Sequence, residues 1–451
     1  MSNNPERLQP RLERLSQALE QGEMDQVRRL LNRGLAPVDV ALVLESTPPR
    51  QREQLWEQID TEAQGEILQY LNDDIQTEFL VRMDASQLVN ATSQLDNDDA
   101  ADLLQRLSHS ALEEVLSTMP SARRTGLETV LSYPEDTAGG LMDTNTITIR
   151  PDVTLEVVLR YLRRHERLPA STDNLLVVTR RSELIGAMPI NRLLVSDPSV
   201  TVREVMDTDI VTINALTHED EVASIFERLD LISAPVISLD NRLLGRITID
   251  DVVDVIQENA AQTMMNMAGI EDEEDTFAPV LRTSRHRAVW LGINLIAATV
   301  VSIAIGFFEN TIQQIAALAV LMPIVSSMGG IAGSQTLTVL IRGISLGHVS
   351  GANVRWLVVR ELLAGSLNGV LWAAVVAVMA VVRFQDGLLA LIIAMAMIIN
   401  LMIAAVVGTL IPVILKKFSI DPALSGGVLL TTITDVVGFV ALLGLATLLY
   451  F

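Results

Sequence analysis

The chain contains no cysteine among its 451 residues. Disulfide bonds and thiolate metal ligands are therefore excluded, and soft or tetrahedral zinc sites lose most of their support. Sites built from oxygen ligands, which hard cations prefer, remain open. The composition thus narrows the metal chemistry before any motif is considered.

Motifs of common catalytic sites and of export are also missing. The sequence has no phosphate-binding glycine loop, no His-Glu-x-x-His pair and no nucleophile elbow, so we do not expect an enzyme. The segment Met1–Glu6 lacks both the basic and the apolar stretch of a signal peptide. We therefore expect the N-terminal part of the chain to stay in the cytoplasm.

Basic residues are scarce, and the deficit is confined to one part of the chain. Residues 281–451 carry nine basic and five acidic residues, a net charge of +4, which leaves −26 for residues 1–280 out of a total of −22. Nucleic acid is not expected as a partner, because its phosphates require Lys and Arg. The acidic surplus is compatible with binding small cations and equally with solubility alone.

Long apolar runs fill the last third of the chain, and five of them are long enough to cross a membrane. The predicted spans are Val289–Phe308, Ile315–Ile341, Leu357–Val382, Leu388–Leu415 and Leu424–Tyr450. Basic residues cluster before the first span, in the second connection and in the fourth, which assigns these segments to the cytoplasmic side. We predict a multi-pass protein of the cell membrane, in bacteria the inner or plasma membrane, with its N-terminus inside and its C-terminus outside.

Asp435 lies inside the fifth span. A carboxylate in the hydrocarbon layer is unfavourable and usually faces a partner, a cavity or an ion path. All nine basic residues of this region lie near the span ends, so none is expected to pair with it. We interpret Asp435 as a cation site in a conduction path; a structural ion pair or a buried hydrogen bond is the alternative. Five helices per subunit are few for a pore, which favours a symmetric homodimer.

The second span combines Pro323 with three glycines, Gly329, Gly330 and Gly333. Proline removes a backbone donor, and broken helices of this kind occur where freed carbonyls line a cavity. The spacing of Gly329 and Gly333 also fits a small-residue packing seam between helices. The sequence leaves both interpretations open, since one helix can serve both purposes.

Residues 35–132 contain an internal repeat of 12 positions. Apolar residues recur at this interval, with Thr47 as the one exception, at Leu35, Ile59, Leu71, Met83, Leu95, Leu107, Met119 and Leu131. The residues that follow the later members are Asp60, Asn72, Asp84, Asp96, Ser108, Pro120 and Ser132. Most of these favour helix starts, so the pattern predicts short helices stacked as a superhelix, usually a binding or regulatory surface. Asp98 and Asp102 share one helix face there, which on spacing alone is better explained as solvated than as a metal site.

Residues 138–262 contain two α/β modules with the same order of strands and helices. This order resembles a tandem pair of cystathionine-β-synthase (CBS) domains, a regulatory module. In such pairs Gly-x-x-Thr-x-x-Asp often marks a ribose contact for adenine nucleotides, and the second module carries it as Gly245, Thr248 and Asp251. The first module has Asn191 where Thr-x-x-Asp should fall. The pattern is therefore complete in only one of the two modules. Where it is complete, the resemblance implies ATP as a ligand, with Thr248 and Asp251 as its contacts.

The complete order of segments resembles the MgtE family of magnesium channels and transporters. Its most specific parts are the glycine-rich second span and the stretch from Asp421 to Val436 in the last span. The resemblance implies a multidomain chain: an N-terminal α-helical superhelix (1–134), tandem α/β CBS domains (135–258), a linker or plug helix with an acidic link (259–284), and an all-α transmembrane pore domain of five helices (285–451). It also implies a homodimer.

Residues at the family's functional positions can be named from the same resemblance. As metal ligands it implies Asp435, Asp421, Asp98, Asp102, Asp220, Asp230, Asp251 and Asp254. As pore-lining residues we take Gly329, Gly330, Gly333, Gly427 and Thr431. The sequence departs from the family at Ile331, Ser334, His218, Asn259 and Gln262, where asparagines of the second span or acids of the sensor and linker are replaced. The assignment of Asp435 to the pore does not depend on these positions. The number and affinity of the sensor sites do depend on them, so those are not carried over from the family.

The expected function is import of Mg²⁺, which the resemblance implies is both the transported and the regulatory ion. High cytosolic Mg²⁺ would bind between acidic surfaces of the N-terminal and CBS domains and hold the linker helix over a closed pore. An importer of Co²⁺, Mn²⁺ or Ni²⁺ is one alternative, disfavoured by the lack of cysteine and of histidine within the membrane. A CBS nucleotide sensor with a membrane anchor is another, but an anchor leaves the buried carboxylate and the glycine-rich spans unexplained.

Overall fold

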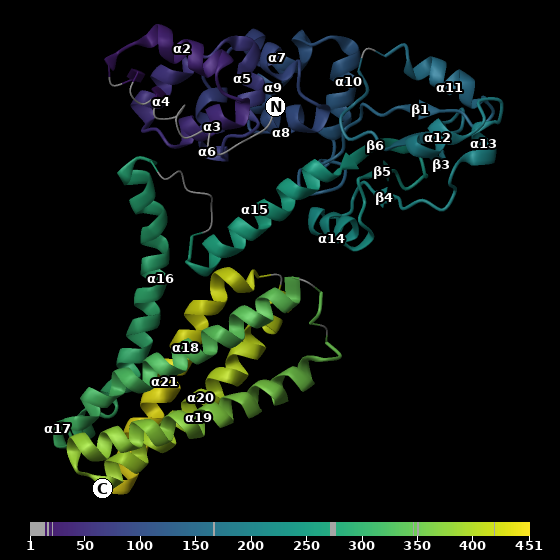
Figure 1. Ribbon diagram of the computed structural model, residues 1–451. Helices are drawn as coiled ribbons and strands as arrows, with labels where there is room; N and C mark the ends of the chain where they lie inside the picture. The colour runs from purple at the N-terminus through teal and green to yellow at the C-terminus, as the bar shows by residue number, and fades with distance from the viewer. Residues whose placement is uncertain are drawn as a thin grey trace. The chain divides into compact units, whose positions relative to one another are not determined.

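The computed structural model describes residues 14–15, 18–19, 21–165, 167–270, 277–345, 347–349, 351–418 and 420–451 (Figure 1). These residues form two compact units. Unit 1 contains the chain up to Ala260, and unit 2 begins at Ala261 and includes Pro279–Phe451. The predicted acidic link, residues 271–275, lies outside the described residues.

Unit 1 begins with a series of short helices. They are α2 (Met24–Arg33), α3 (Pro37–Glu45), α4 (Pro49–Trp56), α5 (Thr61–Leu68), α6 (Asp73–Leu80), α7 (Ala85–Thr92), α8 (Asn97–Gln105), α9 (His109–Thr118) and α10 (Ser121–Val130). The predicted helix starters Asp60, Asn72, Asp84, Asp96, Ser108 and Pro120 are the N-cap residues of α5 to α10. Ser132 starts no helix. The 12-residue repeat is thus one helix and one turn, which confirms the predicted superhelix.

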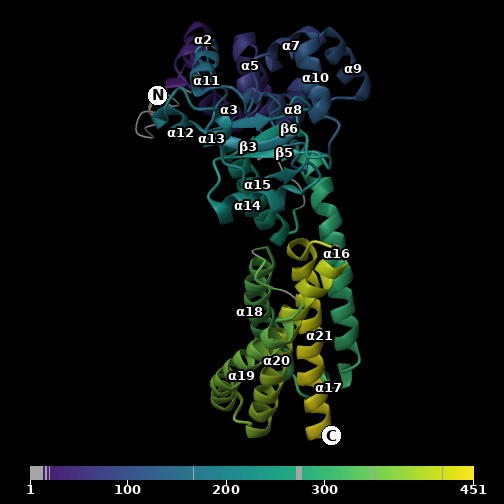
Figure 2. The ribbon, with the colours of Figure 1, turned by 90° about the vertical axis from the view of Figure 1, so that its right-hand side faces the viewer.

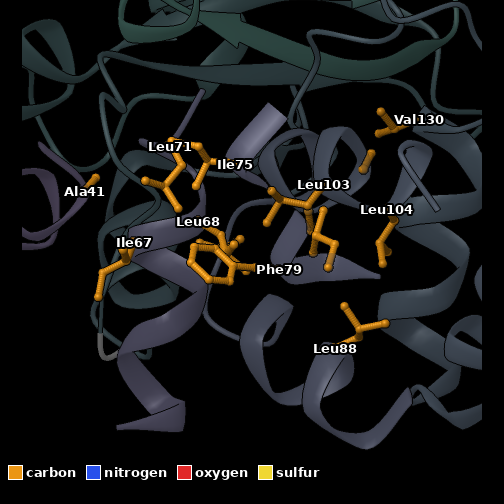
Figure 3. Close-up of a cluster of buried hydrophobic side chains, with 14 of the residues drawn as sticks. Ala41, Ile67, Leu68, Leu71, Ile75, Phe79, Leu88, Leu103, Leu104 and Val130 are labelled. Carbon is orange, nitrogen blue, oxygen red and sulfur yellow. The ribbon is translucent and has the colours of Figure 1, made fainter. Parts of the chain in front are cut away.

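The superhelix stacks each helix on the one two places along. α5 packs against both α3 and α7, and α8 packs against α10. Gly65 allows this closeness, because a Cβ atom there would lie 1.8 Å from the carbonyl oxygen of Ala91. Figure 3 shows the resulting apolar cluster, to which Leu68 of α5 and Phe79 of α6 belong. Phe79 also stacks on Trp56, with 4.1 Å between ring centroids.

Two small sheets follow, and they repeat one topology. The first module contains β1 (Thr148–Ile149), α11 (Leu155–Leu162), β2 (Asn174–Val178), β3 (Leu184–Pro189), α12 (Ile190–Val195) and α13 (Val202–Val205). The second contains β4 (Ile213–Asn214), α14 (Glu219–Leu229), β5 (Ser233–Ile237) and β6 (Leu243–Thr248). In each, the first strand pairs parallel to the second, and the second pairs antiparallel to the third. The predicted pair of α/β modules is confirmed.

Helix α15 (Ile249–Met267) follows β6 directly. Its first part belongs to unit 1, and the part from Ala261 onward belongs to unit 2. The predicted linker helix is therefore a continuous helix that contributes to both units.

Five helices of unit 2 are long and apolar enough to cross a membrane. They are α16 (Val280–Gly306), α18 (Ala317–Ser345), α19 (Val354–Phe384), α20 (Gly387–Lys417) and α21 (Pro422–Tyr450), with the short α17 (Glu309–Gln314) after the first. α20 packs against α18, α19 and α21, while α16 lies beside α21 (Figure 2). Helix α16 starts nine residues before the predicted span, because its basic first turns are compatible with helix although not with a hydrocarbon layer.

Helix α18 is not interrupted at Pro323, which lies inside it. Gly329 and Gly333 are buried against neighbouring helices. A Cβ atom at Gly329 would lie 2.2 Å from the side chain of Asn400, and one at Gly333 would lie 2.8 Å from Leu430. The packing-seam interpretation thus holds for these two glycines, and the broken-helix interpretation does not hold for this span.

Candidate metal sites

A groove of about 750 Å³ runs along α18 and α21 within unit 2. Its lining residues are Ser326, Ser327, Gly330, Ile331, Ser334, Gln335, Thr338, Val339, Thr431 and Asp435. The eight residues from α18 form adjacent pairs spaced four positions apart, so they occupy one stripe of that helix. Asp435 is the one ionisable residue in this lining. This stripe places the hydroxyl and amide groups of Ser326, Ser327, Ser334, Gln335 and Thr338 beside the apolar Ile331 and Val339, so polar side chains line part of a groove on a helix that is long enough to span a membrane.

Asp435 lines the groove from α21 and is hydrogen-bonded to α18. The hydroxyl of Ser326 donates to its Oδ1 atom at 2.5 Å. No Lys or Arg lines the groove in the part of the chain that the structure describes. Asp435 thus makes the interhelical hydrogen bond of the alternative interpretation and also lines the groove. Its role as a cation site stays a prediction.

The five predicted pore-lining residues divide into three groups. Gly330 and Thr431 line the groove. Gly329 and Gly333 do not, because they lie on the packed face of α18. Gly427 is outside the groove, with no other atom within 4 Å of an added Cβ. Helix periodicity explains the split, since residues 329 and 330 are neighbours in sequence but point about 100° apart around the helix.

Asn400 is a residue that the sequence interpretation missed. It is fully buried in α20, and its Nδ2 atom donates to the carbonyl oxygen of Val325 at 2.8 Å. Its Oδ1 atom is buried without a hydrogen-bond partner among the described residues. Gly329 and Gly438 both approach its amide, so α18, α20 and α21 meet at this side chain. An isolated polar residue in the apolar run of the fourth span was the available signal.

Asp421 stands at the start of α21 as its N-cap residue. Its Oδ1 atom accepts from the backbone N–H of Ala423 at 2.9 Å. Its Oδ2 atom accepts from Nδ2 of Asn266 at 2.6 Å, and Asn266 is buried near the end of α15. Gln262 in turn donates to the Oδ1 atom of Asn266 at 2.9 Å. The linker helix and the last span are therefore joined by a hydrogen bond within unit 2.

Unit 1 contains a second acidic site, formed by the first turns of α8 and α15. Burial and the nearby Asp251 raise the pKa of Asp98 well above its usual value. Burial and Asp251 also raise the pKa of Asp99 to about 7. The pKa of Asp102 is raised well above normal by burial and by Glu135. Carboxylates crowded in this way are unfavourable when ionised, and a bound cation would relieve the repulsion.

The residues of this acidic site fit a cation in their chemistry. The Oδ1 atom of Asp98 is buried and has no hydrogen-bond partner among the described residues. Burial raises the pKa of Asp251 to about 7, even though its Oδ2 atom accepts from the N–H and hydroxyl of Thr248 at 3.1 and 2.9 Å. That pair caps α15, so the Thr-x-x-Asp spacing has a structural use in this chain. Burial and Asp250 raise the pKa of Asp254.

The structure does not bring all the predicted sensor acids together. Asp220 is in the first turn of α14, where Asn259 donates to it at 3.0 Å and His218 lies beside it. Asp230 is the exposed C-cap of the same helix, about 15 Å away along its axis. In the part of the chain that the structure describes, no three acidic or histidine side chains are grouped tightly enough to hold a metal ion by themselves. The acids of α8 and α15 are therefore close neighbours, not a formed coordination sphere.

Comparison with known families accounts for most of the chain. Residues 322–445 match the MgtE family of divalent cation transporters. Residues 35–136 match the MgtE intracellular N domain, and residues 138–194 and 202–258 match CBS domains.

Individual relatives align over almost their full lengths. The magnesium transporter MgtE of Bacillus subtilis is 28% identical over 431 residues, covering 95% of both chains. The magnesium transporter MgtE of Thermus thermophilus is 28% identical over 444 residues, covering 96% of this chain and 97% of the relative. Among solved structures, the chain is similar to the cytosolic domain of the Mg²⁺ channel MgtE in complex with ATP. The two share 29% sequence identity and a TM-score of 0.49, and the match covers 53% of this chain and 98% of that one.

The three families occur in the order of the observed segments: helical N domain, paired CBS modules and membrane helices. The chain is therefore a membrane protein with five spans and a cytosolic N-terminal domain, and not an enzyme. It belongs to the MgtE family of magnesium transporters.

Proposed function

We propose that this chain imports Mg²⁺ through the groove of α18 and α21, and that cytosolic Mg²⁺ bound to the acidic site of unit 1 closes the path. The observation that carries the transport half is the position of Asp435, a carboxylate that lines a groove between two helices long enough to span a membrane, together with several hydroxyl and amide side chains. A homodimer would place two such grooves around one axis, so that two copies of Asp435 form one cation site.

The groove suits an ion that keeps its water. Mg²⁺ loses its hydration shell reluctantly and is usually held by one or two carboxylates together with several water molecules. Asp435 supplies the charge, and the oxygens of Ser334, Gln335 and Thr338 line the same groove, where they can accept hydrogen bonds from the hydration shell. Conduction also requires binding that is weak enough for release, which a single carboxylate per chain satisfies better than a cluster would. The inside-negative membrane potential would drive entry.

The gating half rests on the acids of α8 and α15. Their ionised forms repel one another, so the arrangement seen here is favoured when a divalent cation, or protons, neutralise them. Asp98, Asp102, Asp251 and Asp254 are the residues that would hold regulatory Mg²⁺. Binding would shift a closed–open equilibrium toward the closed state, a negative feedback on the cytosolic concentration.

The linker helix provides the connection to the transport path. Asp251 and Asp254 are at the start of α15, and Asn266 is near its end, where it bonds Asp421 at the start of the last span. A helix transmits displacement along its axis, so a change at the acidic site alters the position of Asn266. Asp421 would serve at the cytoplasmic entrance to the path.

A growth experiment tests the transport half. A bacterial strain that cannot take up Mg²⁺ would express the chain, Asp435→Ala and Asp435→Asn, with membrane levels compared by immunoblot. We expect rescue by the unchanged chain and none by either variant, because the amide of asparagine keeps the shape but not the charge. Equal rescue by all three would reject Asp435 as the transport site.

Two other candidate ligands remain predictions. Transport of Co²⁺, Mn²⁺ or Ni²⁺ can be measured in the same strain by metal accumulation. ATP binding rests on the pattern of Gly245, Thr248 and Asp251, and titration of the detergent-solubilised chain with ATP, followed by calorimetry, tests it. Asp230, Asp220 and the outward position of the C-terminus are likewise proposals from the family resemblance.

A further inference from the structure

Ser326 is the one side chain of the described residues that hydrogen-bonds to Asp435. The bond joins two helices, from Oγ of Ser326 on α18 to Oδ1 of Asp435 on α21, over 2.5 Å. Oδ1 therefore accepts a hydrogen bond from the protein, and Oδ2 accepts none from the described residues. Because an aspartate side chain otherwise rotates freely about its last torsion, a single strong bond decides which oxygen faces the groove.

The backbone next to Ser326 is itself held by a hydrogen bond from a third helix. Asn400 of α20 donates to the carbonyl oxygen of Val325, the residue immediately before Ser326, at 2.8 Å. This amide is buried completely, and a Cβ atom added at Gly329 or Gly438 would lie 2.2 or 2.8 Å from its Nδ2 atom. Gly438 lies three residues after Asp435, on the same helix. The side-chain amide of Asn400 thus contacts both α18 and α21 close to the point where Ser326 hydrogen-bonds to Asp435.

We propose that Ser326 is a positioning residue for the transported ion: it holds Oδ1 of Asp435 so that Oδ2 faces the groove, and so sets the affinity for hydrated Mg²⁺. This inference rests on the proposed transport through the groove and adds the residue that orients its carboxylate. Preorganisation of a ligand raises affinity by reducing what must be ordered on binding. Mg²⁺ demands a near-ideal octahedral shell, whereas larger or softer ions tolerate misplacement, so the same bond favours Mg²⁺ over Mn²⁺.

The test uses the full chain in liposomes, with Mg²⁺ influx measured by an enclosed fluorescent indicator over a range of outside concentrations. The variants are Ser326→Ala, Ser326→Thr, Asp435→Ala and a control, Ser366→Ala. Ser366 is a serine of α19 whose hydroxyl donates to the carbonyl oxygen of Leu362 in its own helix, at 2.7 Å, and to no other described residue. We expect Ser326→Ala to raise the half-saturating Mg²⁺ concentration about tenfold, the usual scale for a hydrogen bond to a charged group.

Three further results are expected. Ser326→Thr, which keeps the hydroxyl, stays within about twofold of the unchanged chain, as does Ser366→Ala. Mn²⁺ competes more effectively against Mg²⁺ in Ser326→Ala than in the unchanged chain. Gel filtration confirms that each variant is folded, and the threonine variant separates loss of the hydroxyl from loss of packing.

The failures of the two proposals can be told apart. If Asp435→Ala conducts as well as the unchanged chain, the proposed transport site itself is rejected. If Asp435→Ala is silent and Ser326→Ala matches Ser366→Ala, or binds Mg²⁺ more tightly than the unchanged chain, the transport site stands and the positioning role is overturned. A threonine variant as impaired as the alanine variant also overturns it, because a hydroxyl would then not be the decisive group.

Discussion

The two units use carboxylates in opposite ways. In unit 1, the acids of α8 and α15 are crowded and partly buried, and burial raises the pKa of several of them. In unit 2, Asp435 is the single ionisable residue of its groove and is stabilised by a serine hydroxyl. Crowded acids favour a cation that stays and changes the conformation, whereas one oriented acid favours an ion that passes. The difference is consistent with a sensor in one unit and a path in the other.

The strongest way to separate the two sites is to neutralise the sensor alone. We expect the double variant Asp98→Asn/Asp251→Asn to conduct Mg²⁺ but to require at least a tenfold higher Mg²⁺ concentration on the cytosolic side for half-inhibition, because two of the carboxylates that would bind the regulatory Mg²⁺ are lost. The measurement is influx into liposomes loaded with graded Mg²⁺. Asp152→Asn, an exposed acid of the first CBS module, is the control and should be inhibited normally. Unchanged inhibition in the double variant would contradict the sensor assignment.

A pair of adjacent glycines tests the other side of the comparison, the division of α18 into a packed face and a groove face. Gly329→Ala places a methyl group 2.2 Å from Asn400 and should destabilise the protein by about 2 kcal/mol. Gly330→Ala meets its nearest neighbour, a methyl of Thr431, at 3.9 Å and should leave stability unchanged within about 0.5 kcal/mol. Thermal unfolding in detergent, read by aggregation onset, measures both. Equal destabilisation would mean that the two faces are wrongly assigned.

The sensor acids should also make stability depend on pH when divalent cations are chelated. Burial and Asp251 raise the pKa of Asp99 from 3.8 to about 7, and burial raises that of Asp251 likewise to about 7. A group with a raised folded pKa contributes stability below its unfolded pKa, and this stability is lost as the pH rises through the folded value. We therefore expect the melting temperature in chelator to fall by about 5 °C between pH 5 and pH 8.

Mg²⁺ should restore that loss at pH 8, because it replaces the protons that neutralise the acids. The double variant Asp98→Asn/Asp251→Asn should show both a flatter pH profile and a smaller response to Mg²⁺. A melting temperature in chelator that rises with pH over this range would rule out the crowded acids as the cause.

The smallest expected effect concerns the connection between the sensor helix and the last span. Asn266→Ala removes the hydrogen bond to Asp421 and should raise the Mg²⁺ concentration for half-inhibition about threefold, since a hydrogen bond to a carboxylate contributes modestly when water can replace the donor. Met264→Ala, at an exposed position of the same helix, serves as the control. Identical inhibition curves for the two variants would remove Asn266 from the coupling.

Much of the fold could be predicted from local patterns. The N-cap residues Asn72 and Asp84 could be predicted because a capping side chain accepts a hydrogen bond from a backbone N–H only two or three residues away. The membrane helices could be predicted from their length and hydropathy. Asp435 could be singled out because it is a carboxylate within an apolar span. Each of these signals is contained in one short segment of the chain.

Which residues come together at each site could not be predicted, because it depends on contacts between distant segments of the chain. Gly329 and Gly330 are indistinguishable as residues, yet one packs against Asn400 and the other lines the groove. The partnership of Ser326 with Asp435 joins residues 109 positions apart, and that of Asn266 with Asp421 joins residues 155 positions apart. No spacing rule relates such pairs, because helix packing alone decides which faces meet.

The sequence by itself determined the segment order and the five apolar helices, which follow from residue type and local periodicity, and its motifs determined the resemblance to the family. It also supplied the candidate acids, whose roles stay predictions. The tertiary structure decided which acids are neighbours: Asp98 and Asp251 are brought close, whereas Asp230 lies apart at the end of α14. It also decided that the hydroxyl of Ser326 lies within hydrogen-bond distance of Asp435. The physical reason is that charge repulsion and hydrogen bonding act over a few ångströms of space, and only the folded chain sets those distances.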